Sequence, residues 1–330
     1  MVVKYKKETL LNPGHTACSG CGQLLATRHV IDALGPNTII SNATGCLEVT
    51  TTKYGESAWN VPYIHSLFEN PAAVGSGILA ALKYKTRSAK INKINEIGET
   101  SGKNNLINPA TPANPNVVVM AGDGSTFDIG FGLLAGMFER GDDIFYICYD
   151  NEGYQNTGGQ FSGSTPIGSE TTTTPTGKNS LGSELNKKDM ISFALSQGVP
   201  YVATSSVAYP QDIKTKIENA LKIKGPKYLQ IFVPCVPGWG TDSKDTITIA
   251  KLVVETGFYP ILEFINGKPS KQMKIKSPAV KIEEYLKLQA RFKHLFKEDG
   301  GKDVIKKLQK ICDSNIENYG LSSTSIISKK

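Results

Sequence analysis

The segment Val117–Gln160 constrains the fold of this chain most strongly. Val117–Met120 is a run of apolar, mostly β-branched residues that predicts a buried strand, and a glycine-rich turn places Asp123 where that strand ends. A helical pattern of apolar residues follows, and then a second buried strand, Ile144–Tyr149, which leads directly to Asn151. The segment therefore predicts a βαβ unit with oxygen ligands at two adjacent strand ends.

These oxygen ligands suit a cation that carries a diphosphate. Mg²⁺ takes about six oxygen ligands, and proteins usually supply one or two side chains beside phosphate and water. Asp123 and Asn151 are of the right type, the carbonyl of Gly153 is a third donor, and the helix after Gly124 would offer free amides to the diphosphate. The Gly-Asp-Gly turn with this downstream Asn resembles the thiamine diphosphate-binding motif. The alternative is an ordinary strand-to-helix turn in which Asp123 caps the helix.

Composition indicates a globular chain. Its 330 residues are 39% hydrophobic and 20% charged, which is enough to bury a sizeable core. The sequence has no apolar run of about 18 residues, and Met1–Thr9 is too charged for the core of a signal peptide. We therefore expect a cytoplasmic protein without a membrane span.

The net charge of +7 comes from 37 Lys and Arg against 30 Asp and Glu. Much of the lysine lies in Lys83–Lys103 and Lys268–Lys330, which favours a solvated surface or a patch for an acidic protein partner. No recognition-helix, zinc-finger or aromatic-platform motif accompanies the charge, so we expect no nucleic-acid binding.

Cysteine usage points to a metal or redox centre. Without a secretory signal, the six cysteines do not suggest a disulfide framework. Four of them stand on glycine- or proline-containing loops just beyond apolar segments: Cys18 and Cys21 in a C-x-x-C turn, Cys46, and Cys235. The other two differ, because Cys148 lies inside a predicted strand and Cys312 in a lysine-rich helix. Four loop thiolates suit either a tetrahedral zinc or a [4Fe–4S] cluster, and spacing does not choose between them.

Several motifs in order along nearly the whole chain resemble the β subunit of pyruvate:ferredoxin oxidoreductase, in the 2-oxoacid:ferredoxin oxidoreductase family. The motifs are Gly14–Gly22, Asn42–Glu48, Trp59–His65, Phe68–Asn70, the Gly-Asp-Gly unit, Asn156–Gln160, Pro234–Trp239 and Glu284–His294.

The resemblance implies three cofactors: thiamine diphosphate, Mg²⁺ and one [4Fe–4S] cluster. It implies that the cluster is bound by Cys18, Cys21, Cys46 and Cys235. It also implies that Mg²⁺ is held by Asp123, Asn151 and the Gly153 carbonyl, and that the cofactor is further lined by Gly122, Gly124, Ser125 and Asn156, with Asn156 assisting catalysis.

The same resemblance implies the reaction and the partners. The reaction would be coenzyme A-dependent oxidative decarboxylation of pyruvate to acetyl-CoA and CO₂, or its reverse, with ferredoxin as electron partner. Only one strand–Gly-Asp-Gly–helix unit is present, so an α subunit would supply the general acid–base glutamate, and γ and δ subunits are further candidates. One alternative is the same chemistry on the branched-chain substrate 2-oxoisovalerate. An alternative of another class is a zinc-stabilised, non-catalytic assembly subunit.

The predicted fold is an α/β thiamine diphosphate-binding fold with a mainly parallel sheet flanked by helices. We expect the cofactor-binding domain to span residues 1–245 and a mostly helical extension to span residues 246–330, packed on the domain or a partner. Lys85–Asn116 is polar and rich in Asn and Lys, with prolines near its end, which predicts a mobile surface insertion.

Overall fold

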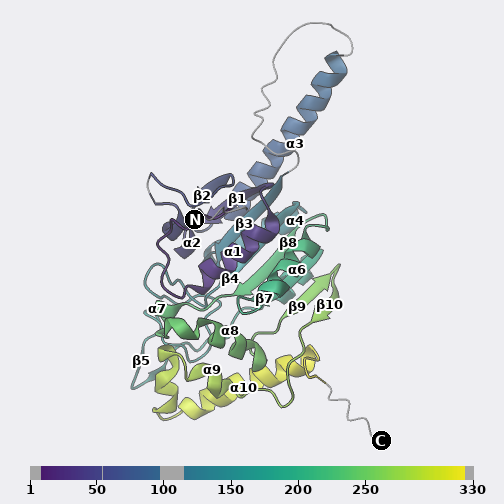
Figure 1. The fold of residues 1–330 in the computed structure, drawn as a ribbon. Coiled ribbons are helices and arrows are strands. Elements are labelled where there is room, and N and C mark those ends of the chain that lie inside the picture. Colours follow the sequence, from purple (N-terminus) through teal and green to yellow (C-terminus); the bar gives the residue numbers. More distant parts are fainter. Residues whose placement is uncertain (1–8, 54, 97–114, 324–330) are drawn as a thin grey trace, which may run out of the picture.

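The computed structural model describes residues 9–53, 55–96 and 115–323, with side chains left undescribed at residues 89–96. The described chain builds around one eight-stranded sheet in the order β10-β9-β7-β8-β4-β3-β1-β2 (Figure 1). Six strands run parallel: β1 (Thr38–Ala43), β2 (Tyr63–Ser66), β3 (Asn116–Gly122), β4 (Ile144–Asp150), β7 (Tyr201–Ser206) and β8 (Lys227–Phe232). β9 (Leu262–Ile265) pairs antiparallel with β7 and with β10 (Lys268–Gln272). The predicted α/β fold with a mainly parallel sheet is confirmed.

Helices cover both faces of the sheet. α1 (Gly22–Leu34) packs against α6 (Pro210–Ala220) on one face, and α3 (Pro71–Glu96) packs against α4 (Phe131–Glu139) on the other (Figure 1). The remaining elements are α2 (Cys46–Thr51), η1 (Gly124–Ile129), the short hairpin β5 (Thr176–Gly177) and β6 (Ser180–Leu181), α5 (Met190–Ser196), α7 (Val236–Trp239), η2 (Ser243–Asp245), α8 (Thr246–Glu255), α9 (Ile282–Leu286), η3 (Ala290–Phe296) and α10 (Gly301–Asn318).

The central strands owe their position to their composition. β4 is buried at every residue, as expected of a strand covered by helices on both faces, and its apolar run shows no alternation. β3 pairs with it in parallel, with Gly122 opposite Tyr149, so both strands end at the same edge of the sheet. Gly141 adopts a φ of 63° and ends the helix between them, as predicted.

The helix after the Gly-Asp-Gly turn begins differently from the prediction. Gly124–Ile129 forms a π-helical turn, and the regular helix α4 starts only at Phe131. Wide turns of this kind are frequent at functional sites, where they displace backbone from the regular path. Periodicity of apolar residues does not distinguish the two helix types, because both bury the same side chains over so short a segment.

Lys85–Asn116 departs from the predicted loop over the part that is described. Helix α3 continues through Glu96 and projects beyond the sheet (Figure 1), and Asn116 already belongs to β3. Residues 85–96 contain no glycine or proline, and the first proline after the helix is Pro109, so polarity alone did not exclude a helix. Residues 97–114 lie outside the described part of the chain.

The C-terminal segment from residue 246 is largely helical and packs on the rest of the chain, through α8 against β7 and through Tyr285 of α9, whose hydroxyl donates to Glu152. It also supplies β9 and β10, which extend the main sheet past β7. Sequence reasoning did not predict these two strands, because β9 is only four residues long and β10 is polar and exposed. No helix in the described residues is long and apolar enough to cross a membrane.

Candidate functional site

One small pocket at the carboxyl edge of the sheet collects the predicted cofactor ligands. It lies where β1, β3 and β4 end, the edge at which open α/β sheets bind their ligands. All seven residues predicted to contact the cofactor line it: Gly122, Asp123, Gly124, Ser125, Asn151, Gly153 and Asn156. Cys46 lines the same pocket.

Tyr154 narrows this pocket. Its ring packs over Gly124, so closely that a side chain at that glycine would overlap it, and its hydroxyl donates to the Gly124 carbonyl at 2.9 Å. A ligand that contacts the Gly124 backbone on this side must displace the Tyr154 ring.

Three oxygen-bearing groups meet at the base of the pocket. The end of the Asn151 side chain lies 2.9 Å from Asp123 Oδ1 and 2.8 Å from the Gly153 carbonyl oxygen. If the amide nitrogen faces these oxygens, it donates to both; if the amide oxygen faces them, three oxygens converge. Adjacent ligands of octahedral Mg²⁺ lie about 2.9 Å apart, since the Mg–O distance is about 2.0–2.1 Å. The donor types and these two separations therefore fit a magnesium ion.

The Asp123 carboxylate is completely buried and receives two hydrogen bonds. Ser162 Oγ donates to its Oδ2 at 2.5 Å, and the backbone N–H of Asn151 donates to its Oδ1 at 3.2 Å. Burial raises the pKa of Asp123 well above its usual value, and the negative charge of Asp150 raises it further. A nearby cation would stabilise the charged form, so the site is electrostatically suited to one.

The four loop cysteines also gather at this edge. Burial, and after it the charges of Cys235, Cys21 and Cys18 in that order, raise the pKa of Cys46 to about 12. Cys235 behaves similarly, with burial first and then Cys21 and Cys18 among the groups that raise its pKa, to about 11. The backbone brings two of these loops together, because the Gly22 amide donates to the Pro234 carbonyl at 3.3 Å and so places Cys21 near Cys235. Cys46 lines the pocket that also contains Asp123.

Three of the thiols lie at the first turn of a short or regular helix. Cys21 caps helix α1, whose Leu24 amide lies 3.5 Å from its Sγ, and Cys46 begins α2 directly after β1. Cys235 precedes α7, and Gly238 in that helix passes so close to Gln155 that a side chain there would overlap it. The loop after β8 therefore packs directly on the loop that carries Asn156.

A single metal ion and a cluster require different separations between their thiolate ligands. Thiolates around one tetrahedral zinc lie about 3.8 Å apart, because each Zn–S bond is about 2.3 Å. Over the described residues, no group of three or more His, Cys, Asp or Glu side chains is placed to hold a single metal ion. A [4Fe–4S] cluster is a larger body and separates its ligands further. Cys148 lies in β4 and Cys312 in α10, the kinds of element that the sequence predicted for them, and both are fully buried.

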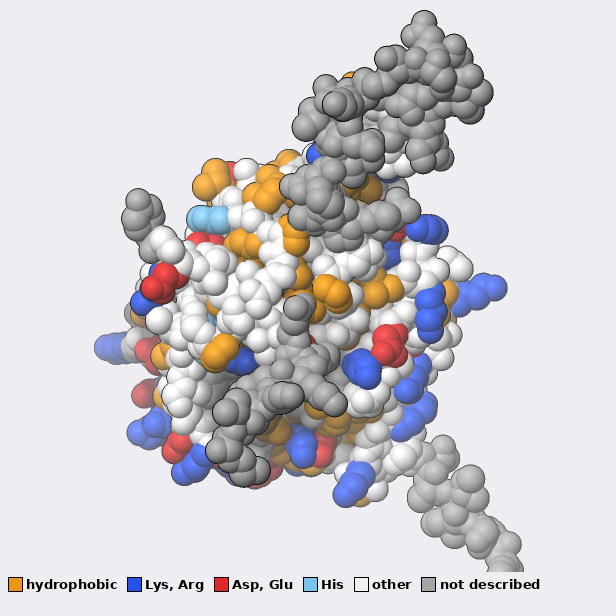
Figure 2. Space-filling view, turned by 45° about the horizontal axis from the view of Figure 1, so that its top comes forward, with side chains coloured by type: hydrophobic (Ala, Val, Ile, Leu, Met, Phe, Trp, Pro, Cys, Tyr) orange, Lys and Arg blue, Asp and Glu red, His pale blue; other side chains and the backbone are white. Residues whose placement is uncertain are grey.

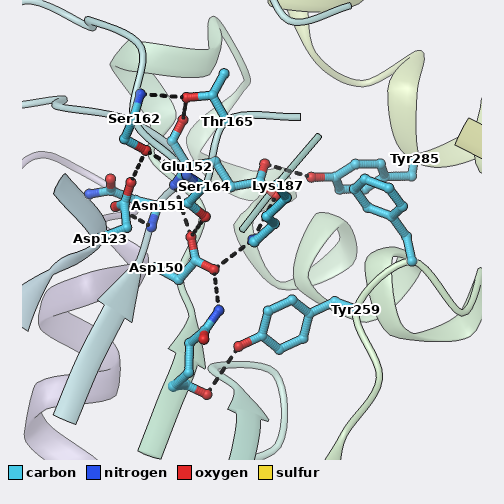
Figure 3. A network of polar contacts seen from close by, with 12 residues as sticks. Asp123, Asp150, Asn151, Glu152, Ser162, Ser164, Thr165, Lys187, Tyr259 and Tyr285 are labelled. Atoms are coloured by element: carbon cyan, nitrogen blue, oxygen red, sulfur yellow. Dashed lines mark hydrogen bonds and ion pairs between the residues drawn. The ribbon is translucent and has the colours of Figure 1, made fainter. Parts of the chain in front are cut away.

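A buried polar network lies behind the oxygen site, and sequence reasoning missed it (Figure 3). Asp150 accepts hydrogen bonds from Lys187 at 2.6 Å and from Ser164 at 2.5 Å. Glu152 pairs with Arg291 at 2.5 Å, although the two residues are 139 positions apart in the sequence. The two acids flank the predicted ligand Asn151 in sequence, and that was the available signal. Their basic partners are remote and carry no motif of their own.

Comparison with known proteins agrees with this site. Residues 97–231 match the family model described as thiamine pyrophosphate enzyme, C-terminal TPP binding domain. The chain is 45% identical over 318 residues to pyruvate synthase subunit PorB of Methanosarcina barkeri, covering 96% of this chain and 99% of that protein. The chain belongs to the 2-oxoacid:ferredoxin oxidoreductase family.

Other members of this family differ in their named substrate. Ketoisovalerate oxidoreductase subunit VorB of Pyrococcus abyssi is 43% identical over 291 residues, which are 87% of this chain and 86% of that protein. The solved 2-oxoglutarate:ferredoxin oxidoreductase from Magnetococcus marinus matches 91% of this chain and 97% of its own, with a TM-score of 0.53 and 21% identity. At that identity the likeness supports the shared fold of the family.

Proposed function

We propose that this chain is the β subunit of a pyruvate:ferredoxin oxidoreductase and carries thiamine diphosphate, Mg²⁺ and one [4Fe–4S] cluster. The observation that carries the proposal is the pocket at the sheet edge, which Asp123, Asn151 and Cys46 line together. An oxygen site for a diphosphate-bound cation and a group of four thiols are thus neighbours in one subunit. The reaction consumes pyruvate, coenzyme A and two oxidised ferredoxins, and yields acetyl-CoA, CO₂, a proton and two reduced ferredoxins.

The residues of this chain have different roles in the proposed function. Asp123, Asn151 and the Gly153 carbonyl would hold the cation, while Gly122, Gly124 and Ser125 would line the diphosphate. Cys18, Cys21, Cys46 and Cys235 would hold the cluster. When bound, thiamine diphosphate supplies the chemistry that decarboxylates a 2-oxoacid, and the cluster accepts electrons one at a time. Asn156 borders the open side of the pocket and is suited to orient the substrate by hydrogen bonding.

Partner subunits would complete the site. Hydrophobic side chains lie at the surface on one face of the molecule (Figure 2). Two large exposed side chains are close in sequence to residues that line the pocket. Leu67 is 59% exposed and precedes the lining residue Phe68, and Ile129 is 58% exposed and ends η1, which begins with the lining residues Gly124 and Ser125. Exposed apolar residues beside a site favour a protein interface there. We infer that an α subunit covers this edge and supplies the acid–base glutamate. Two of the curated relatives are themselves named as subunits. Ferredoxin, coenzyme A and γ and δ subunits are further proposed partners.

Pyruvate is proposed as the substrate because the relative with 45% identity is named pyruvate synthase and aligns over 96% of this chain. The ketoisovalerate relative leaves 2-oxoisovalerate as the second candidate. The substrate test is turnover by the complete enzyme of pyruvate against 2-oxoisovalerate at equal concentration. A higher kcat/KM for the branched-chain acid would overturn pyruvate as the substrate.

The cofactor test is anaerobic purification with assays for iron, sulfide, zinc and thiamine diphosphate. We expect a brown protein with about four irons per chain. Asp123→Asn should lose thiamine diphosphate but keep iron, and Cys46→Ala should lose iron. A colourless protein with one zinc and no thiamine would instead establish the non-catalytic, zinc-stabilised alternative.

A further inference from the structure

Glu152 has an unusual backbone conformation between two proposed magnesium ligands. It lies between Asn151 and Gly153, its φ is 58°, and its side chain is buried. This left-handed conformation is unfavourable for a residue with a Cβ, and it persists only where the surroundings hold it. Because it turns the chain sharply, it allows the Asn151 side chain and the Gly153 carbonyl to approach within 2.8 Å of each other.

The side chain of Glu152 is held by groups from distant parts of the chain. Arg291 Nη2 donates to its Oε2 at 2.5 Å. The Tyr285 hydroxyl donates to the same oxygen at 3.3 Å (Figure 3). Lys187 lies 3.5 Å from its other oxygen. Thr165 donates to the backbone carbonyl of Glu152 at 2.9 Å, so the residue is fixed at both its side chain and its backbone.

Arg291 is fixed in turn, and it contacts a second anchor of the same loop. Its guanidinium donates two hydrogen bonds to Gln289 Oε1, from Nε at 2.9 Å and from Nη2 at 2.7 Å. The guanidinium also stacks 3.9 Å from the centre of the Trp239 ring. The indole of Trp239 donates to the Asn151 carbonyl at 3.0 Å. Arg291 therefore reaches the proposed ligand segment through Glu152 on one side and through Trp239 on the other.

We propose that Glu152 and Arg291 are positioning residues that set the affinity of the cation site. The buried pair holds residues 151–153 in the turn that directs Asn151 and the Gly153 carbonyl toward Asp123, without contacting the cation itself. The C-terminal segment thereby controls a site built at the ends of β3 and β4. This inference rests on the proposed function, because it assumes that the oxygen site binds Mg²⁺ with thiamine diphosphate.

The competing explanation is that the pair only stabilises the fold. Two variants separate the explanations: Glu152→Gly, which removes both the pair and the cost of the left-handed conformation, and Glu152→Gly combined with Arg291→Met, which also removes the orphaned charge. The double variant should regain thermal stability relative to the single variant, since a lone buried guanidinium is strongly unfavourable. If positioning is the role, cation affinity should stay low in both.

The measurement is the affinity for Mn²⁺ in the presence of thiamine diphosphate, detected by electron paramagnetic resonance. It uses the full chain assembled with its partner subunits. We expect affinity to fall roughly 10-fold or more in both variants, the range usual for residues that orient metal ligands. Glu263→Gln is the matched control, because Glu263 is also buried and paired, with Tyr201 and Asn219, but lies in β9 away from the pocket. It should lower stability without changing affinity.

The outcomes distinguish this inference from the proposed function. If the unsubstituted protein binds neither Mn²⁺ nor thiamine diphosphate, the proposed function fails. If it binds both, and the Glu152→Gly variants bind Mn²⁺ as tightly as it does, the positioning role is refuted. Recovery of affinity together with stability in the double variant would likewise assign the pair to fold stability alone.

Discussion

Asp150→Asn tests whether the buried network behind the cofactor pocket stabilises the fold through charge. Asp150 is fully buried, and its Oδ2 accepts from Lys187 at 2.6 Å and from Gln230 at 2.7 Å. Its Oδ1 accepts from Ser164 at 2.5 Å and from the Glu152 amide at 3.2 Å. All four partners thus donate to one carboxylate.

An asparagine cannot reproduce this pattern. If its oxygen takes the position facing Lys187 and Gln230, its NH₂ group must face the Glu152 amide, which is also a donor. Ser164 can rotate its hydroxyl to accept, but the amide contact is lost. The larger effect is electrostatic: burial lowers the pKa of Lys187, and the charges of Asp150 and Glu152 outweigh it, so that its pKa is raised.

The expected magnitude follows from the partners that remain. Removing one member of a buried ion pair costs about 3–5 kcal/mol. Lys187 is 23% exposed and keeps Glu152 at 3.5 Å, so the lower end of that range applies, about 3 kcal/mol. For a chain of this size each kcal/mol shifts the unfolding midpoint by roughly 2 °C, which gives a fall of roughly 6 °C.

The assay is thermal unfolding at one fixed scan rate, with Asp303→Asn as the matched control. Asp303 pairs with Lys306 at 3.1 Å, but both side chains are more than 70% exposed, at 72% and 74%. An exposed pair of this kind contributes little, so the control should change the midpoint by no more than roughly 2 °C. Equal shifts of the unfolding midpoint in the two variants would refute the argument that the Asp150 charge stabilises the fold because it is buried.

Three further substitutions test the pocket and its surroundings. Tyr154→Phe removes the hydrogen bond that holds the ring on Gly124 and should tighten thiamine diphosphate binding by up to roughly 5-fold, as measured by titration; weaker binding would show that the hydroxyl contacts the cofactor. Trp239→Phe removes the donor to the Asn151 carbonyl and should cost about 1 kcal/mol, seen as a lower unfolding midpoint; an unchanged midpoint would contradict this. Cys148→Ala should leave the iron content unchanged, and loss of iron would show that this buried thiol is a cluster ligand.

The local features of the site were predictable because they depend on neighbouring residues. Strand β3 was expected at Val117–Met120 and is observed at Asn116–Gly122, and β4 was expected at Ile144–Tyr149 and is observed at Ile144–Asp150. Buried strands are short apolar runs, and glycine turns end them, so both signals lie within a few residues. Parallel pairing then places Asp123 next to the end of the other strand.

Other features required the assembled structure. The continuation of α3 to Glu96 was missed because its polar sequence lacks an apolar stripe. β9 and β10 were missed because their strand signal is weak, and only pairing with β7 makes them strands. Tyr154 was not predicted to narrow the pocket, since that depends on where its ring falls in three dimensions.

The residues proposed to bind the cofactors can be identified from the sequence alone: an aspartate and an asparagine after two buried strands, and four thiols on loops. The groups that surround these residues depend on how the chain folds in three dimensions. Glu152 and Arg291 are 139 positions apart and pair in the interior, and Lys187 reaches Asp150 from a loop. The physical reason is that a buried charge requires a partner, and packing can bring that partner from any position along the chain.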